Sequence, residues 1–310
     1  MCMIWSMFGR RVEMLQWCTI RGKCMKYYLC VILAIFFWSS SVIATKIAYA
    51  SITPILLCLI RFAISSVLMM VVFLFRKNRV HIAKQDLKPV LVSAILGISV
   101  YYALENVALA KTSASDASLI EAAFPALTAL VGLVVYRERP SKRMLAGIAA
   151  SIIGVAVLTQ FDPGQSSSLL GDFLLLFDGC LWGFYNYETK SISHKYDSFT
   201  LTMYQCAIGT VFFVPMLALE KPVLTNITPA FILTLVYLST ACSLGALLLY
   251  NYGLKGMKAS TAAVIMNLMP IFGVLLSWGI LHETITLRKL IGGVIILLGV
   301  WISTTRDKTA

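Results

Sequence analysis

Ten stretches of mostly apolar residues, each long enough to cross a bilayer, follow one another along the chain. A membrane-spanning helix needs about 20 such residues, because the hydrocarbon core of a bilayer is about 30 Å thick. The stretches lie near residues 27–49, 54–75, 88–110, 113–136, 142–160, 169–190, 198–219, 229–254, 258–281 and 286–304. With 59% hydrophobic and only 13% charged residues, the chain lacks the polar surface of a soluble protein. The sequence therefore predicts an all-α integral membrane protein of ten transmembrane helices.

Lys and Arg are unevenly divided between alternate connections of these stretches. They are frequent in residues 76–88 and 137–143, whereas the intervening connections hold few, such as Lys111 and Lys221. Positive side chains accumulate on the cytoplasmic side of a membrane. The pattern predicts a multi-pass protein of the cell membrane, inner or plasma, with both termini cytoplasmic. The formal net charge of +12 follows from this topology and does not indicate a nucleic-acid partner.

The second half of the chain repeats the first. A shift of 145 positions aligns identical residues, and the aligned pairs are Asn106 with Asn251, Leu109 with Leu254, Ser115 with Ser260, Ala117 with Ala262, Pro125 with Pro270, Glu138 with Glu283, Arg143 with Arg288, Gly147 with Gly292 and Gly154 with Gly299. Near the start of each half, a shift of 144 aligns Trp38 with Trp182. Five stretches in each half make the halves cross the membrane in opposite senses, an inverted repeat of the kind that builds secondary transporters.

The repeat divides the chain into parts. Residues 26–160 form the first repeat and residues 169–304 the second, joined by a linker over residues 161–168. Residues 305–310 form a cytoplasmic tail. Residues 1–25 hold no continuous apolar run, and we expect them to be a disordered N-terminal extension or an over-extended start.

The two halves share motifs with a known family. These are WSSSVIATKIA at residues 38–48, ALAKTSASDASLIEAAFP at residues 108–125 and its echo YGLKGMKASTAAVIMNLMP at residues 252–270. With them the chain resembles the drug/metabolite transporter superfamily, specifically its EamA group of ten-helix proteins, over nearly all of residues 26–304. The resemblance implies a transporter with a central cavity lined by both halves, often an exporter of amino acids or related metabolites.

Two carboxylates lie inside the third and fourth apolar stretches. Glu105 has Tyr101 and Tyr102 one helical turn before it, and Glu121 lies about two turns into the next stretch. An ionisable group within a bilayer costs about 3 kcal/mol or more and usually faces a bundle interior or a wet cavity. Glu105 and Glu121 are therefore candidates for proton coupling or for recognition of a substrate amine, with an interhelical hydrogen bond or ion pair as the structural alternative. Neither acid is repeated in the second half.

Two further charged residues lie deep in apolar stretches. Arg61 is at a depth similar to that of Glu121, so we expect it to be the countercharge of that acid, or else to grip a substrate carboxylate. Asp178 lies between apolar residues with Gly179 and Gly183 beside it, which allow a close helix approach. Proton relay and simple packing are both open for Asp178.

Aromatic and amide residues gather where the repeats are expected to meet, as in a small-ligand site. The candidates for substrate binding or coupling in this group are Trp38, Tyr101, Tyr102, Trp182, Tyr185, Asn186, Tyr250, Asn251 and Asn267. Pro125 and Pro270 occupy equivalent mid-stretch positions, and we predict that they act as hinges. Glu138 and Glu283 follow the fourth and ninth stretches, where capping or ion pairing of a helix end is expected.

The sequence contains no motif for catalysis, nucleotide hydrolysis or metal binding. We therefore expect no enzyme activity, no cofactor and no metal. The predicted partners are a small-molecule substrate, the lipid bilayer, and protons or another coupling ion. The sequence favours a secondary transporter, an exporter of an amino acid or amine-bearing compound. A drug or nucleotide-type metabolite carrier of the same fold is the alternative, and a non-transporting membrane scaffold or sensor is a weaker one.

Overall fold

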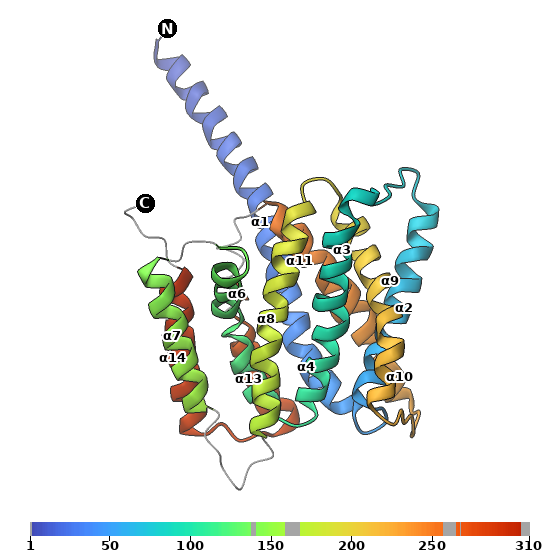
Figure 1. Cartoon of the computed structure of the whole chain (residues 1–310). Coiled ribbons are helices and arrows are strands. Elements are labelled where there is room, and N and C mark those ends of the chain that lie inside the picture. Colours follow the sequence, from blue (N-terminus) through green and yellow to red (C-terminus); the bar gives the residue numbers. More distant parts are fainter. Residues whose placement is uncertain (1, 138–140, 159–167, 257–264, 267, 305–310) are drawn as a thin grey trace.

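A computed structural model of the chain describes residues 2–137, 141–158, 168–256, 265–266 and 268–304 (Figure 1). Within these ranges the chain is a bundle of helices without a β-strand. The helices are α1 (Cys2–Ala48), α2 (Pro54–Phe75), η1 (Lys84–Asp86), α3 (Leu87–Ala94), η2 (Ile95–Val100), α4 (Tyr101–Leu109), α5 (Ala114–Glu121), α6 (Phe124–Val134), α7 (Lys142–Leu158), α8 (Leu169–Ile192), α9 (Ser198–Met216), η3 (Leu217–Leu219), α10 (Pro229–Tyr237), η4 (Leu238–Gly245), α11 (Ala246–Gly256), α13 (Leu268–Leu281) and α14 (Leu287–Thr304).

Several of these helices are suited to a membrane. In the part of the chain that the structure describes, five helical segments are long and apolar enough to cross a bilayer, or six if the bent pair α5–α6 counts as one span. The five are Met25–Ala48, Pro54–Phe75, Lys84–Leu109, Ser198–Leu219 and Pro229–Gly253. Large apolar side chains point outward on them, for example Val67 at 62% exposure, as expected of a surface that faces lipid. The chain is therefore a multi-pass membrane protein.

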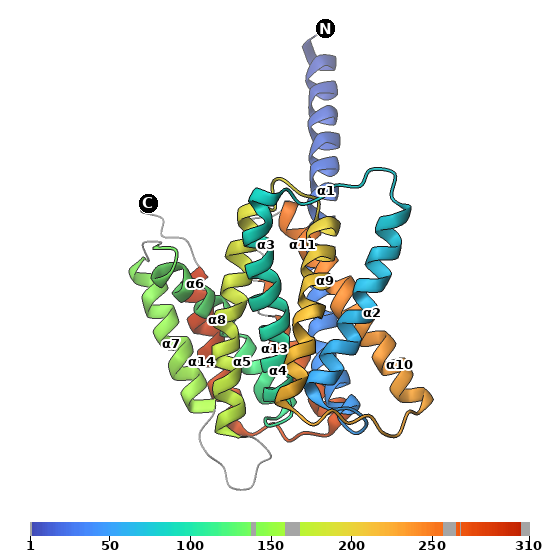
Figure 2. The ribbon, with the colours of Figure 1, turned by 45° about the vertical axis from the view of Figure 1, so that its right-hand side comes forward.

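The first helix is longer than the apolar stretch that it contains. Helix α1 starts at Cys2, and its N-terminal part projects well beyond the rest of the bundle (Figures 1 and 2). The described part of the predicted extension over residues 1–25 is thus helical. Its separation from the first repeat stays a prediction.

The sequence predicted one helix for the fourth apolar stretch, but the structure has two helices there. Helices α5 and α6 are bent by 43° at a break after Glu121. Pro125 lies in the first turn of α6, where a missing N–H leaves no helical hydrogen bond unmade. The same proline cannot continue the hydrogen bonding of α5, so the chain restarts its helix here. The bend lies directly beside one of the two candidate acids.

The packing of the helices follows the repeat. When each helix is replaced by its equivalent 144–145 residues along the chain, a packed pair becomes another packed pair. Helix α1 packs against α11 and α13, and α8, its counterpart in the second half, packs against α4 and α6. Helices α2 and α9 pack together, and so do α7 and α14, which stand at one side of the bundle (Figure 2). Every one of these contacts joins one half of the chain to the other. The centre of the bundle is consequently an interface between the halves.

Matching irregularities occur in the two halves. The π-helical segments η2 and η4 interrupt otherwise α-helical spans, and Val100 at the end of η2 aligns with Gly245 at the end of η4. A π-helical turn costs helix stability and is often found at functional sites. Helix α4, which carries Glu105, and helix α11, which carries Tyr250, both follow such a segment directly.

Candidate functional site

Three carboxylates lie buried in the centre of the bundle. Glu105 on α4, Glu121 at the end of α5 and Asp178 in the middle of α8 are 8%, 2% and 0% exposed. They lie within electrostatic range of one another, and all three act on the phenol of Tyr101. Neither carboxylate oxygen of Glu121 or Asp178 has a hydrogen-bond partner among the described residues. Buried polar atoms are nearly always paired in a structural role, so these four oxygens require an explanation.

Arg61 on α2 is almost completely buried, but it is not the countercharge of Glu121. Its Nε donates to the Ser243 hydroxyl of η4 at 2.8 Å, and its guanidinium lies 5.2 Å from the ring centroid of Tyr102. No ion pair of Arg61 occurs among the described residues, and both carboxylate oxygens of Glu121 are without a hydrogen-bond partner there. The predicted pairing with Glu121 is therefore wrong. Depth along two neighbouring stretches does not fix which helix faces which, and α2 packs against α4 and η4.

The candidate aromatic residues form one continuous cluster, which contains Trp38, Tyr101, Tyr102, Trp182, Tyr185 and Tyr250 and which we call the aromatic cluster. The ring of Trp182 stacks on Tyr185 at 5.0 Å between centroids and meets Trp38 edge-on at 5.6 Å. Tyr250 lies 5.1 Å from Trp38, and Tyr101 lies 5.5 Å from Trp182. All six residues are at most 7% exposed. Asp178 lies one helical turn before Trp182, and Glu105 lies one turn after Tyr101, so these acids border the aromatic cluster and we treat them as one site.

The amides are brought less completely into this site. Asn186 donates to the backbone carbonyl of Trp182 in its own helix. Asn251 donates to the Thr202 hydroxyl of α9 at 3.0 Å, with its side-chain oxygen unpartnered among the described residues. Asn267 lies outside the described residues. The binding role of the three amides stays a prediction.

The prolines and glycines singled out in the sequence lie at close helix contacts. An added Cβ at Gly179 would lie 2.4 Å from Leu127 Cδ1 of α6, which confirms a tight approach of α8 beside Asp178. Pro125 accompanies the 43° bend, and Pro270 is buried in the first turn of α13. A hinge role for either proline stays a prediction.

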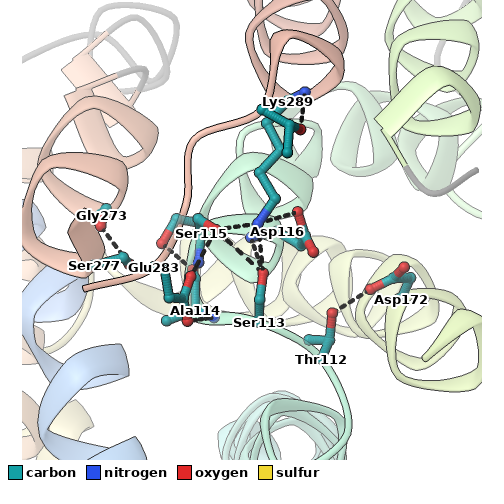
Figure 3. A network of polar contacts seen from close by, with 12 residues as sticks. Thr112, Ser113, Ala114, Ser115, Asp116, Asp172, Gly273, Ser277, Glu283 and Lys289 are labelled. Carbon is teal, nitrogen blue, oxygen red and sulfur yellow. Dashed lines mark hydrogen bonds and ion pairs between the residues drawn. The ribbon is translucent and has the colours of Figure 1, made fainter. Parts of the chain in front are cut away.

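A second polar assembly, which we call the α5 network, lies at the N-terminus of α5 (Figure 3). It is at the end of the bundle opposite the projecting part of α1 (Figure 1). Glu283, from the loop before α14, accepts hydrogen bonds from the backbone N–H groups of Ala114 and Ser115 at 2.9 and 3.0 Å. It also accepts from the Ser115 hydroxyl at 2.7 Å. A carboxylate in this position satisfies helix-end N–H groups that otherwise lack partners. Glu283 acts as a helix cap, as predicted, but the sequence placed this role within its own hairpin, whereas the helix that it caps is α5 of the other half. Glu138, its counterpart, lies outside the described residues.

Lys289 of α14 completes the α5 network from the same side (Figure 3). Its ammonium donates to the hydroxyls of Ser113 and Ser115 at 3.1 and 2.6 Å and forms an ion pair with Asp116 at 3.3 Å. Lys289 and Asp116 are only 5% and 4% exposed. Next to this group, Lys46 of α1 donates to the backbone carbonyl of Thr112. Contacts of this network thus join α1, α5 and α14.

The environment of Glu283 affects its ionisation, and this residue lies in a loop outside the membrane-spanning segments. Partial burial raises the pKa of the carboxyl, whereas the hydrogen bonds from Ser115 and Ala114 and the charge of Lys289 lower it. The lowering effects are together the stronger, so the pKa of Glu283 lies below its ordinary value. The carboxylate is consequently ionised at neutral pH and acts as a charged cap.

Sequence reasoning missed the buried pair of Asp116 and Lys289. The signal was present: under the 145-residue shift Asp116 aligns with Thr261, and Lys289 aligns with Met144. Glu105 and Glu121 were chosen as candidates because the other half of the chain has no acid at the equivalent positions. By the same criterion, Asp116 and Lys289 are also candidates, because neither charge is repeated. Among the described residues, no group of three His, Cys, Asp or Glu side chains is arranged to hold a metal ion.

The fold and its interior define a polytopic helical membrane protein whose polar side chains gather between two halves. The sequence profile of the EamA-like transporter family matches residues 25–160 and, a second time, residues 169–305. The chain belongs to the EamA-like transporter family. It is therefore a membrane transporter.

Individual relatives agree with this assignment. An uncharacterized transporter of Archaeoglobus fulgidus is 31% identical over 91% of this chain and 98% of its own length. The uncharacterized transporter YcxC of Bacillus subtilis is 27% identical over 88% of this chain and 91% of its own length. A "probable terminal-alkyne amino-acid exporter" of Streptantibioticus cattleyicolor is 24% identical over 72% of this chain and 74% of its own length. A solved crystal structure superposes with a TM-score of 0.64 at 19% identity, over 89% of this chain and 95% of that one, which concerns the fold alone.

Proposed function

We propose that this protein is a secondary active transporter that exports a small metabolite, such as an amino acid or an amine-bearing compound, by alternating access. The observation that carries the proposal is the buried site between the halves, where carboxylates without a partner among the described residues adjoin the aromatic cluster. A transporter needs such a site at the interface of two units that move against each other. The named exporter among the relatives supports an outward direction of transport.

The proposed architecture is ten helices in two inverted repeats, residues 26–160 and 169–304, with both termini cytoplasmic. The exchange of packing partners under the 144–145-residue shift supports it, as does the double match of the family profile. A further pair of contacts agrees. Glu220 accepts from the Thr53 hydroxyl at 2.8 Å at the start of α2, and Arg76 pairs with Asp197 at 3.2 Å at the start of α9. The shift of 144 maps Thr53 onto Asp197 and Arg76 onto Glu220, so one contact is made twice with different charges.

In the proposed cycle the two halves rock about the site. The α5 network closes one end of the site by tying the start of α5 to α14. The bend after Glu121, together with Pro125 and the π-helical segments η2 and η4, provides places where a helix changes direction without breaking a long run of hydrogen bonds. Opening that end requires the α5 network to separate.

Two alternatives are less well supported. A carrier of nucleotide-type anions needs a surplus of buried cations, but among the described residues Arg61 is opposed by three acids in the site. A non-transporting scaffold or sensor needs each buried acid to be paired, and the oxygens of Glu121 and Asp178 are not paired within the described residues. The open oxygens are the observation that separates a transporter from a scaffold.

The test is flux into proteoliposomes that contain the purified full-length chain. Labelled amino acids and amines are assayed by counterflow, with and without an imposed pH gradient, for the native protein and for Glu121→Gln. We expect counterflow of at least one compound above that of empty liposomes, and a loss of about tenfold or more in the variant. Glu188→Gln is the matched control, because Glu188 accepts a hydrogen bond from Tyr136 away from the site. Flux equal to that of empty liposomes for every compound would contradict the proposal.

A further inference from the structure

Among the described residues of the central site, more hydrogen-bond acceptors than donors are without a partner. Four carboxylate oxygens, from Glu121 and Asp178, have no partner within the described residues, and both side chains are at least 98% buried. The buried ammonium of Lys289 is committed to the α5 network. A buried carboxylate without a partner loses the full free energy of its hydration. A ligand group that brings hydrogen-bond donors and positive charge into the site recovers that free energy, as does a proton on each carboxyl group.

The wall beside these acids is aromatic. Trp38, Trp182 and Tyr250 meet one another through their rings, and Asp178 lies one helical turn before Trp182 on α8. Faces of Trp and Tyr attract a cation through the quadrupole of the ring. A ligand that enters between these rings gains aromatic contacts on an apolar body. The combination of acids and aromatic rings is thus complementary to a cation that carries an apolar or aromatic body.

The charge balance argues against a free carboxylate on the ligand. Among the described residues three buried acids oppose one guanidinium, and Arg61 already has Ser243 at its Nε. The carboxylate of an amino acid would bring a fourth negative charge into the same buried space. That charge would lose its hydration without gaining a cation of its own.

Two donors in the site are also open among the described residues, namely Nη2 of Arg61 and the indole N–H of Trp38. A neutral oxygen, such as a hydroxyl group, satisfies either of them without adding charge. These donors therefore set no requirement for an anionic ligand group.

From these observations we infer that the substrate class of the central site is an arylalkyl monoamine without a free carboxylate, with its ammonium on Glu121 and Asp178 and its ring on the aromatic cluster. This inference rests on the proposed transport function and narrows its substrate from amino acids or amines to amines. Neither acid has an acidic counterpart in the other half: Glu121 aligns with Met266, and Asp178 aligns with Ala34 under the shift of 144. The two acids that bind the ammonium group are therefore found at positions where the two halves of the chain differ.

The experiment compares three probes that share a phenyl ring. Phenylethylamine, phenylalanine and 3-phenylpropionate carry an amine, both groups, and a carboxylate alone. Binding to the purified full-length chain in nanodiscs is followed by tryptophan fluorescence, with empty nanodiscs as the control for partition into lipid. We expect phenylethylamine to bind with a Kd at least about tenfold lower than that of phenylalanine, and 3-phenylpropionate to show no saturable binding below about 10 mM.

Variants locate the binding. Glu121→Gln and Asp178→Asn are each expected to weaken phenylethylamine binding by about tenfold or more, whereas Glu188→Gln, on the same helix as Asp178, leaves it unchanged. Equal or tighter binding of phenylalanine would overturn the inference, and so would saturable binding of none of the probes. Amine binding that both acid variants retain would also overturn it. Selective amine binding with no flux in proteoliposomes would uphold the inference and contradict the proposed transport function.

Discussion

The centre of the bundle and the α5 network both contain buried charged side chains, but these side chains are paired in the α5 network and, among the described residues, unpaired in the centre. In the α5 network, Lys289 is paired with Asp116 and two hydroxyls, and Glu283 holds two backbone N–H groups. In the centre, Glu121 and Asp178 have no partner among the described residues. A paired charge stabilises the arrangement in which it is paired, whereas an unpaired one has its interaction free for a ligand or a proton.

The largest effect is expected from breaking the pair in the α5 network. Lys289→Met introduces the residue that the first half has at the equivalent position, Met144, and leaves Asp116 as an unpaired buried charge. We expect a loss of about 3 kcal/mol in the free energy of unfolding. The measurement is equilibrium unfolding of the full-length chain in mixed micelles.

The double variant provides the control for this prediction. Adding Asp116→Thr, which introduces the residue that the second half has at the equivalent position, Thr261, removes the orphaned charge and should restore at least about half of the lost stability. A single variant as stable as the native protein, or a double variant no better than the single one, would show that the α5 network does not hold its end of the bundle closed.

A smaller, pH-dependent effect is expected at Glu283. Its folded-state pKa lies below the unfolded value of about 4.3, so its stabilising contribution is complete above about pH 5 and is lost as pH falls through the unfolded and then the folded value. Glu283→Gln should lower the free energy of unfolding by about 1 kcal/mol at neutral pH. The melting-temperature difference between native protein and variant should shrink as the pH falls from about 5 to about 3.5. A difference independent of pH would mean that the charge of Glu283 is not what caps α5.

Much of this arrangement was readable from the sequence, and the rest was not. Apolar length and the repeat predicted the positions of the helical segments, and the aromatic cluster was assembled from residues at matching places, such as Trp38 and Trp182. Pairings across long sequence distances were not accessible: Arg61 donates to Ser243, and Lys289 pairs with Asp116. Helical periodicity gives the face of a residue within its own helix, but the rotation of one helix against another depends on all side chains at their contact.

In the centre of the bundle, removing a charge should change the free energy of unfolding in the opposite direction. Asp178→Asn replaces a buried acid, unpartnered among the described residues, by a neutral side chain of the same shape, which removes the cost of burying a charge. We expect the free energy of unfolding to stay unchanged or rise by about 1 kcal/mol, while counterflow falls by about tenfold or more. Unfolding and flux are measured on the same preparation. A loss of stability above about 2 kcal/mol with normal flux would assign Asp178 to packing, the structural alternative that the sequence left open.

The smallest effect is expected where a charge pair is neither buried nor part of the site. Arg76 and Asp197 are ion-paired at 3.2 Å, but their side chains are 37% and 35% exposed, so water and salt screen the attraction. Arg76→Gln should therefore change the free energy of unfolding by less than about 0.5 kcal/mol, measured as for Lys289→Met. Both variants remove one cation from a carboxylate at the start of a helix. The difference between their changes in the free energy of unfolding therefore reports the effect of burial. If Arg76→Gln were as damaging as Lys289→Met, the cross-half contact itself, and not its burial, would set the stability of the bundle ends.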